Sequence, residues 1–208
     1  MTTPSVDVWW ADLTAADLAL LPDLPEAERR RVLAVPQDAD RGRSLVAAAL
    51  LQHAVATHRG RAQGPPTAGT STGAPVEVDR TCADCGEQHG RPVVDGGPHL
   101  SVAHAGLLVV VATCADAPVG VDVERLGRDL PHGTDAQGWT LREARTKAGA
   151  GPRVGTGETV LTPPMPGYAA ALVVAPVAGR PGAGVGVPDV HEHRWRPDRG
   201  AAPRGVRG

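Results

Sequence analysis

The chain has 208 residues, of which 41% are hydrophobic and 21% are charged, and its formal net charge is −2. These values are typical of a globular domain, and the nearly balanced charge argues against the strongly basic surface of a nucleic-acid-binding protein. The longest apolar run, residues 107–115, is far shorter than the roughly 20 residues of a membrane helix. Residues 1–10 lack the basic and apolar regions of a secretory signal, so we expect a cytoplasmic protein without membrane contact.

The amino-acid usage is strongly biased. The chain has no Phe, Ile or Asn, one Tyr, 26 Gly and 20 Pro, and its single lysine, Lys147, stands among 21 basic residues. The codons of the missing residues are rich in A and T, so a GC-rich gene explains the bias, and the arginine content does not indicate nucleic-acid binding. Three cysteines are too few to indicate a disulfide framework, which fits a reducing compartment.

Hydrophobic periodicity and turn residues predict a mixture of helices and strands. The predicted elements, in chain order, are a strand at 6–10, a helix beginning at Pro25, a longer helix from about Asp38 or Asp40 to His58, a strand over 99–114 broken at Gly106, a strand at 119–124, a helix at 140–148 and a strand at 166–177. Residues 59–80 are rich in Gly, Pro, Ser and Thr and predict a loop, while the Gly-, Pro- and Arg-rich segment from 178 predicts a disordered tail.

Two carboxylates share one face of the strand at 119–124. Side chains alternate across a strand, so Asp122 and Glu124 point to one side, and Val121 and Val123 point to the other. Two carboxylates on one side of an apolar strand repel each other unless a cation lies between them, and carboxylate oxygens are ligands that Mg²⁺ takes. The alternative is an exposed face on which both carboxylates are solvated or face Arg125.

Glu143 and Lys147 are four residues apart and share a face of the helix predicted at 140–148. This spacing fits a surface ion pair, with Thr140 and Glu143 at capping-box spacing, or a polar site. The position of the only lysine favours the site. Arginine would serve a surface ion pair equally well, whereas a compact ammonium suits a phosphate oxygen in a crowded site.

Cys82, Cys85 and His89 form a C-x₂-C-x₃-H pattern that could bind Zn²⁺. A structural zinc needs four ligands, and either Cys114 or His99 could be the fourth. The alternative is a metal-free loop. The remaining histidines near the C-terminal end, His191 and His193, are expected to be solvated.

Together, these segments resemble the surfactin-type (Sfp-type) family of 4'-phosphopantetheinyl transferases. The resemblance rests on five motifs in the family's order: the Arg-rich helix with the DADRGR start of the next helix at 38–43, GRP at 90–92, LSVAHAG at 100–106, PVGVDVE at 118–124 and WTLREARTK at 139–147. It covers about residues 6–175.

The resemblance implies an α+β fold of two similar α/β lobes related by a pseudo-two-fold axis, with the active site between them. The lobes are expected at residues 1–115 and 116–177, the second being shortened, and the disordered tail at 178–208. The implied reaction moves the phosphopantetheine arm of coenzyme A to a serine of an acyl or peptidyl carrier protein and releases 3',5'-ADP. Such enzymes serve fatty-acid or secondary-metabolite biosynthesis, and members of this size are often monomers.

The resemblance also implies a role for each matching residue. Asp122 and Glu124 would bind Mg²⁺, and Glu143 would complete the metal site and take the proton from the carrier serine. Lys147 would contact the coenzyme A phosphates. Further contacts to coenzyme A, at the nucleotide and its 3'-phosphate or in support of them, are expected from His104, Arg43, Arg30 and Arg91.

The chain departs from the family pattern in four places, of which the mildest is Arg142 in place of the lysine before Glu143 in the last motif. Ala103 replaces the usual serine before the motif histidine, so one coenzyme contact is expected to be lost, and Gln52 stands where the helix often carries Arg. Only 18 residues separate Glu124 from Glu143, where the family has a longer segment that helps to form the carrier-protein surface. Two other functions therefore compete with the transferase. One is a non-catalytic homologue that binds coenzyme A or a carrier protein, and the other is a small zinc-stabilised interaction module centred on residues 82–89.

Overall fold

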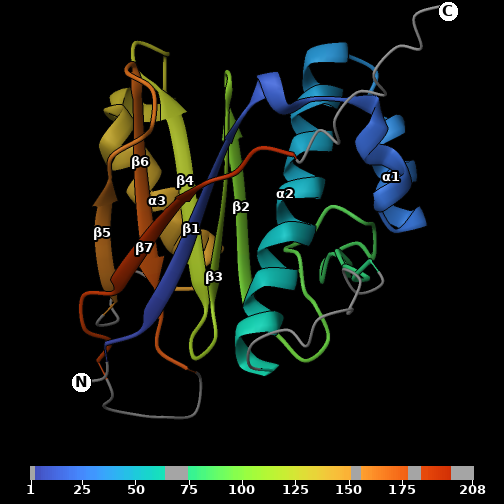
Figure 1. Ribbon diagram of the computed structural model, residues 1–208. Helices are drawn as coiled ribbons and strands as arrows, with labels where there is room; N and C mark the ends of the chain where they lie inside the picture. Colours follow the sequence, from blue (N-terminus) through green and yellow to red (C-terminus); the bar gives the residue numbers. More distant parts are fainter. Residues whose placement is uncertain (1–2, 64–74, 151–155, 178–183, 198–208) are drawn as a thin grey trace, which may run out of the picture.

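The computed structural model describes residues 3–63, 75–150, 156–177 and 184–197. Over these ranges the chain forms a mixed α+β fold with two sheets, of strand order β2-β3-β1-β7 and β4-β6-β5. Helices α1 and α2 lie outside the first sheet and α3 lies outside the second, so the layers run α, β, β, α (Figure 1). The α+β class predicted from the sequence is therefore confirmed.

The first sheet has three antiparallel strands and one parallel strand at its edge. Its strands are β1 (Ser5–Asp12), β2 (His99–Ala105), β3 (Leu108–Cys114) and β7 (Asp189–Arg194). Gly106, with φ +53°, turns the chain between β2 and β3, at the break that the sequence predicted. Strand β3 is buried at every position because one of its faces packs on the second sheet and the other on α2.

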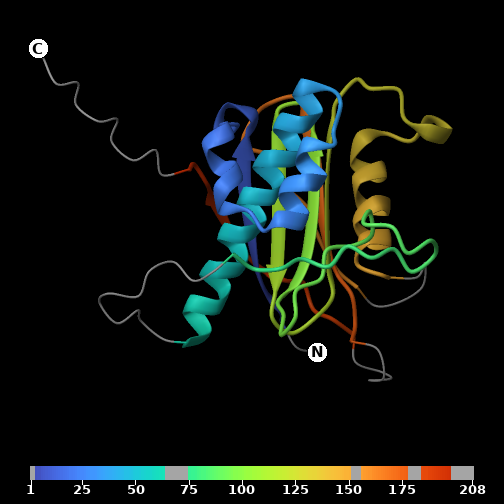
Figure 2. The same ribbon diagram turned by 90° about the vertical axis from the view of Figure 1, so that its right-hand side faces the viewer.

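Helix α2 (Asp38–Gln63) covers the outer face of the first sheet, as Figure 2 shows from that side, and α1 (Glu26–Leu33) packs against α2. Leu50 and Val55 of α2 pack with Val109 and Val111 of β3. The sequence predicted that α2 would end at His58, but the helix continues for five further residues. Three short 3₁₀ helices complete the helical elements, at Leu13–Ala15, Leu18–Asp23 and Pro131–Gly133.

The second sheet packs closely on α3 because small residues line their contact. Its elements are β4 (Val119–Arg125), α3 (Ala136–Lys147), β5 (Gly157–Leu161) and β6 (Tyr168–Val174). Ala144 of α3 packs with Ala171 of β6. At Gly120 of β4, an added Cβ would lie 2.0 Å from the carbonyl oxygen of Ala144. The helix backbone therefore rests directly on the strand.

The inner faces of the two sheets enclose the largest apolar cluster. Val121 and Val123 of β4 point into it, as the predicted alternation requires. The edge strands β2 and β4 lie side by side, and the N–H of Val121 donates a 2.9 Å hydrogen bond to the buried hydroxyl of Ser101. This bond joins the two sheets at their shared edge.

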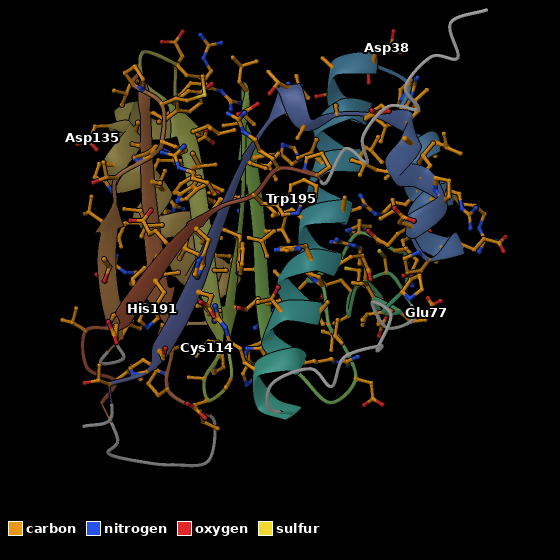
Figure 3. The ribbon with its side chains drawn as sticks, viewed as in Figure 1. Asp38, Glu77, Cys114, Asp135, His191 and Trp195 are labelled. Carbon is orange, nitrogen blue, oxygen red and sulfur yellow. The ribbon has the colours of Figure 1, made fainter. Side chains whose placement is uncertain are left out.

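Strands β5 and β7 were not predicted, and for residues 189–194 the prediction of a disordered tail was wrong. Strand β7 runs parallel to β1, and Trp10 Nε1 donates a 2.7 Å hydrogen bond to Glu192 Oε2. Trp195 follows the strand and lies beside α2, 6.1 Å from the ring of His53 (Figure 3). The sequence DVHEHR gave no strand signal because most of its side chains lie exposed at a sheet edge, where apolar alternation is not needed.

The loop predicted at 59–80 falls largely on residues 64–74, which lie outside the described residues. Its first residues belong to α2, and Asp79 forms an antiparallel bridge with Val93. Among the described helices, none combines the length and the apolar character that crossing a membrane requires.

We expect Gly120→Ala to lower the free energy of unfolding by about 1–3 kcal/mol, because the added methyl group would push α3 away from β4. Gly60→Ala is the matched control, since Gly60 lies in α2 with no atom near its Cβ position. Removing a glycine from a helix stabilises it by about 1 kcal/mol. Urea unfolding of both variants measures the effects, and equal effects would contradict the close contact.

Candidate functional site

Most of the predicted site residues meet on the outer side of the β2–β4 edge, between α2 and α3. Figure 2 shows strands of this region between the two helices. Each side chain comes from an element that the fold brings to this edge. They are Arg43 of α2, His104 of β2, Asp122 and Glu124 of β4, and Glu143 and Lys147 of α3.

Asp122 is the buried centre of the group. Asp122 is 6% exposed, and its Oδ1 accepts a 2.6 Å hydrogen bond from Lys147 Nζ. Its other oxygen, Oδ2, is buried and has no hydrogen-bond partner among the described residues. Burial raises the pKa of Asp122, and the negative charges of Glu124 and Glu143 raise it further, against the opposing effect of Lys147. The site therefore holds negative charge that Lys147 balances only in part.

Lys147 pairs across elements rather than along its own helix. In addition to Asp122, its Nζ donates to the carbonyl oxygen of Val121 at 3.3 Å. The alternative of a surface ion pair with Glu143 is therefore wrong. The capping box at Thr140 is also wrong, because α3 begins earlier and is capped by Asp135, whose Oδ1 accepts a 2.6 Å hydrogen bond from the N–H of Gly138.

Glu124 and Glu143 are both partly exposed. Glu124 Oε2 lies 3.2 Å from an exposed guanidinium nitrogen of Arg128. The carboxylate of Glu143 makes no hydrogen bond or ion pair with any other residue that the structure describes. Arg125, the sequence-based alternative partner of Glu124, instead lies against Gly106 at the β2–β3 turn. Glu143 is thus the carboxylate of the group most available to a ligand.

The basic side of the group lies on β2 and α2. Arg43 donates a 3.0 Å hydrogen bond to the carbonyl oxygen of Gly106 and forms an ion pair with Asp40. Partial removal of the ring from water lowers the pKa of His104, and the positive charges of Arg43 and Lys147 lower it further. The imidazole is therefore held in its neutral form beside two permanent cations.

Two predicted residues are not brought into the group. Arg30 lies on α1, where it is exposed and pairs with Glu26. Arg91 lines a pocket of about 440 Å³ with His99, at the opposite end of β2 from His104. The two histidines are five residue steps apart along the strand, which corresponds to about 17 Å. Arg91 would therefore contact a different part of any ligand that lies along this edge.

The two departures from the family motifs have structural explanations. Gln52 forms two 2.7 Å hydrogen bonds with the backbone of Val76, and so ties α2 to the segment that follows the loop. Ala103 points into the apolar cluster between the sheets, whereas Ser101 carries the hydroxyl of this strand. Neither substitution leaves a polar atom unpaired.

Sequence reasoning gave no role to Tyr168 at this edge. Its hydroxyl accepts a 2.9 Å hydrogen bond from the N–H of Leu107, and it lies against Gly106, so β6 is joined to the β2–β3 turn. The one available signal was that this is the only tyrosine of the chain.

The structure also brings Cys82, Cys85 and His89 together, with all three ligand atoms within 4.8 Å of one another. Neither candidate for a fourth ligand joins them. Cys114 is buried in the apolar cluster between the sheets, and His99 pairs with it across β2 and β3.

The chain matches no family model, and no curated protein matches it. Three carboxylates, one with a buried unpaired oxygen, suit a hard divalent cation such as Mg²⁺. An ammonium and a guanidinium beside them suit the oxygens of a phosphorylated ligand.

The raised pKa of Asp122 predicts a specific pH dependence of stability. The folded protein binds this proton more tightly than the unfolded chain does. The contribution of Asp122 to the free energy of unfolding therefore falls as the pH rises from about 4 through the raised pKa, and it is constant above. Asp122→Asn lacks this titration, so we expect the variant to gain stability relative to the wild type as the pH rises through that window.

Urea unfolding across this pH range, with a chelator present, measures the difference. Glu158→Gln is the control. The hydrogen bond from Arg145 lowers the pKa of Glu158, so the contribution of Glu158 to the free energy of unfolding is lost as the pH falls, which is the opposite direction from Asp122. A stability difference for Asp122→Asn that does not change with pH would contradict the raised pKa.

Proposed function

We propose that this chain transfers the 4'-phosphopantetheine arm of coenzyme A to a serine of an acyl or peptidyl carrier protein in a Mg²⁺-dependent reaction. The proposal combines the sequence resemblance with the geometry of the β2–β4 edge. The observation that carries it is the buried, unpaired Oδ2 of Asp122, which lies among two further carboxylates and beside Lys147. A site of this kind fits a divalent cation and a pyrophosphate together.

In this proposal, Asp122, Glu124 and Glu143 hold Mg²⁺. When bound, Mg²⁺ neutralises charge on the pyrophosphate of coenzyme A and so supports phosphoryl transfer. Lys147 contributes a second, compact positive charge, and on ligand binding its Nζ would exchange part of its contact with Asp122 for a phosphate oxygen. Glu143, the most available carboxylate, accepts the proton of the carrier serine directly or through water.

The basic residues on the other side of the edge are suited to the nucleotide part of coenzyme A. Arg43 of α2 lies partly exposed beside His104 of β2, on the side of the group opposite α3. The pocket that Arg91 lines also includes His99, which is about 17 Å along β2 from His104. An extended ligand would therefore be needed to reach both His104 and this pocket. Coenzyme A is such a ligand.

The second candidate function is a non-catalytic homologue that binds coenzyme A or a carrier protein. One observation favours it. Strand β4 ends at Arg125 and α3 begins at Ala136, so only a short connection with one 3₁₀ helix stands where the family forms part of its carrier-protein surface. The two candidates share the coenzyme A site and differ in whether a carrier serine can reach it.

The test is to incubate the protein with coenzyme A, Mg²⁺ and several apo carrier proteins, and to measure the phosphopantetheine mass gain. We expect the gain with wild type, and at least a 100-fold slower reaction with Asp122→Ala or Glu143→Gln, on the order of the loss expected for a missing catalytic proton acceptor. Glu158→Gln is the matched control. Glu158 lies on β5 and pairs with Arg145 of α3, outside the group of site residues.

If no carrier is modified while coenzyme A still binds, as measured by calorimetry, the non-catalytic candidate is supported. If folded protein shows no modification and binds neither coenzyme A nor any of the carrier proteins, both candidates fail.

We expect Lys147→Arg to bind coenzyme A at least about tenfold more weakly than wild type, although the positive charge is kept. The longer planar guanidinium cannot replace an ammonium that fits between Asp122 and the Val121 carbonyl. Arg145→Lys makes the reverse exchange on the same helix and is expected to leave binding unchanged. Equal affinities for wild type and Lys147→Arg would show that only charge matters at this position.

A further inference from the structure

Cys82, Cys85 and His89 form a cluster near the tip of the hairpin at 79–93. Their two Sγ atoms and one imidazole nitrogen all lie within 4.8 Å of one another, and Cys85 Sγ is 3.0 Å from His89 Nε2. The ligand atoms of a tetrahedral zinc site are about 3.5–3.8 Å apart, given Zn–S and Zn–N bonds of about 2.3 and 2.0 Å. A small opening of the cluster would therefore admit the ion.

The backbone of the hairpin holds these side chains in place. The N–H of Cys82 donates to the carbonyl oxygen of Glu87 at 2.8 Å, and the N–H of Gly90 donates to the carbonyl oxygen of Arg80 at 2.7 Å. Gly90 is required here, because a Cβ would lie 2.8 Å from the carbonyl oxygen of Thr81. The three ligands are thus organised by contacts that do not involve a metal.

The donor atoms of the cluster, two sulfurs and one imidazole nitrogen, suit a metal that prefers sulfur ligands. A thiolate is the metal-binding form, and two thiolates with a neutral imidazole balance the charge of Zn²⁺. Sulfur ligands also select Zn²⁺ over hard cations such as Mg²⁺, so this cluster is chemically distinct from the carboxylates around Asp122.

Apolar packing does not explain the compact shape of this tip. Every residue from 81 to 89 is exposed except Cys82, which is half-buried, and apart from the two cysteines Ala83 is the only apolar residue in the range. In segments that bury so little, a bound metal ion commonly supplies the cross-link.

We propose that Cys82, Cys85 and His89 bind one Zn²⁺, with water in the fourth position, and that the ion clips the tip of the hairpin. No other Cys or His among the described residues joins the cluster. The same hairpin carries Arg80, whose Nε lies 2.8 Å from the buried Glu28 carboxylate of α1. The clip therefore steadies the contact between the hairpin and α1, independently of the reaction proposed for the β2–β4 edge.

The test uses the full chain, freed of metal and reduced, and titrated with Zn²⁺ or Co²⁺. We expect one ion per chain by elemental analysis, and thiolate-to-Co²⁺ absorption bands that Zn²⁺ abolishes. Cys82→Ser and Cys85→Ser should weaken Zn²⁺ binding by more than roughly 100-fold, the upper end of what outer-shell changes cost. Cys114→Ala removes the third cysteine, which lies in the core, and should bind as the wild type does.

A second readout is the melting temperature, which Zn²⁺ should raise in wild type and Cys114→Ala but not in Cys85→Ser. Three outcomes would overturn the proposal. They are a wild type that takes up no stoichiometric Zn²⁺, a Cys85→Ser variant that binds as tightly as wild type, and a Cys82–Cys85 disulfide in the protein as purified.

Discussion

The meeting of β2 and β4 at one edge is the constraint on which the candidate site depends. The two strands belong to different sheets, and the bond from the N–H of Val121 to the buried Ser101 hydroxyl joins them. The outer face of one sheet thereby continues into that of the other, with α2 on one side and α3 on the other. The fold thus brings Arg43 and His104, which are 61 positions apart in sequence, to one surface together with residues from α3.

Asp122 shows what this arrangement costs. A carboxylate that is almost completely buried loses hydration, and here one of its oxygens receives nothing in return from the described residues. A chain selected only for stability would place an apolar or an amide side chain there, because buried ion pairs contribute little to stability. Lys147 offsets part of the cost, yet Glu124 and Glu143 add to it. Buried groups with a shifted pKa are typical of functional sites.

The sequence predicted those features that depend on spacing along one element. The alternation in β4 assigned Val121 and Val123 to the core and Asp122 to the other face, and the rarity of lysine singled out Lys147. The ion pair with Glu143, which the spacing offered as the alternative for Lys147, is absent, and the fold provides Asp122 from another element instead. Partners that meet only through tertiary packing leave no local pattern.

The failure of the sequence patterns to predict β5 and β7 has a related cause. Strand β5 is short, and β7 is an exposed edge strand whose order comes from pairing with β1. A strand of this kind is specified by its neighbour and by a few contacts, such as Glu192 with Trp10, rather than by apolar alternation. The composition also hides β7 in the sequence, because the Gly-, Pro- and Arg-rich residues around this strand are typical of disorder.

The parallel pairing of β1 with β7 has a consequence for the newly made chain on the ribosome. Ser5 pairs with Asp189, so β1 waits for a partner strand that lies 184 residues later in the chain. Until then, the antiparallel sheet of β1, β2 and β3 can form, but β1 presents an open row of backbone groups with two tryptophans beside it. Such an edge invites pairing with other chains. Translation speed and chaperone supply would therefore affect the yield of this protein more than its finished structure suggests.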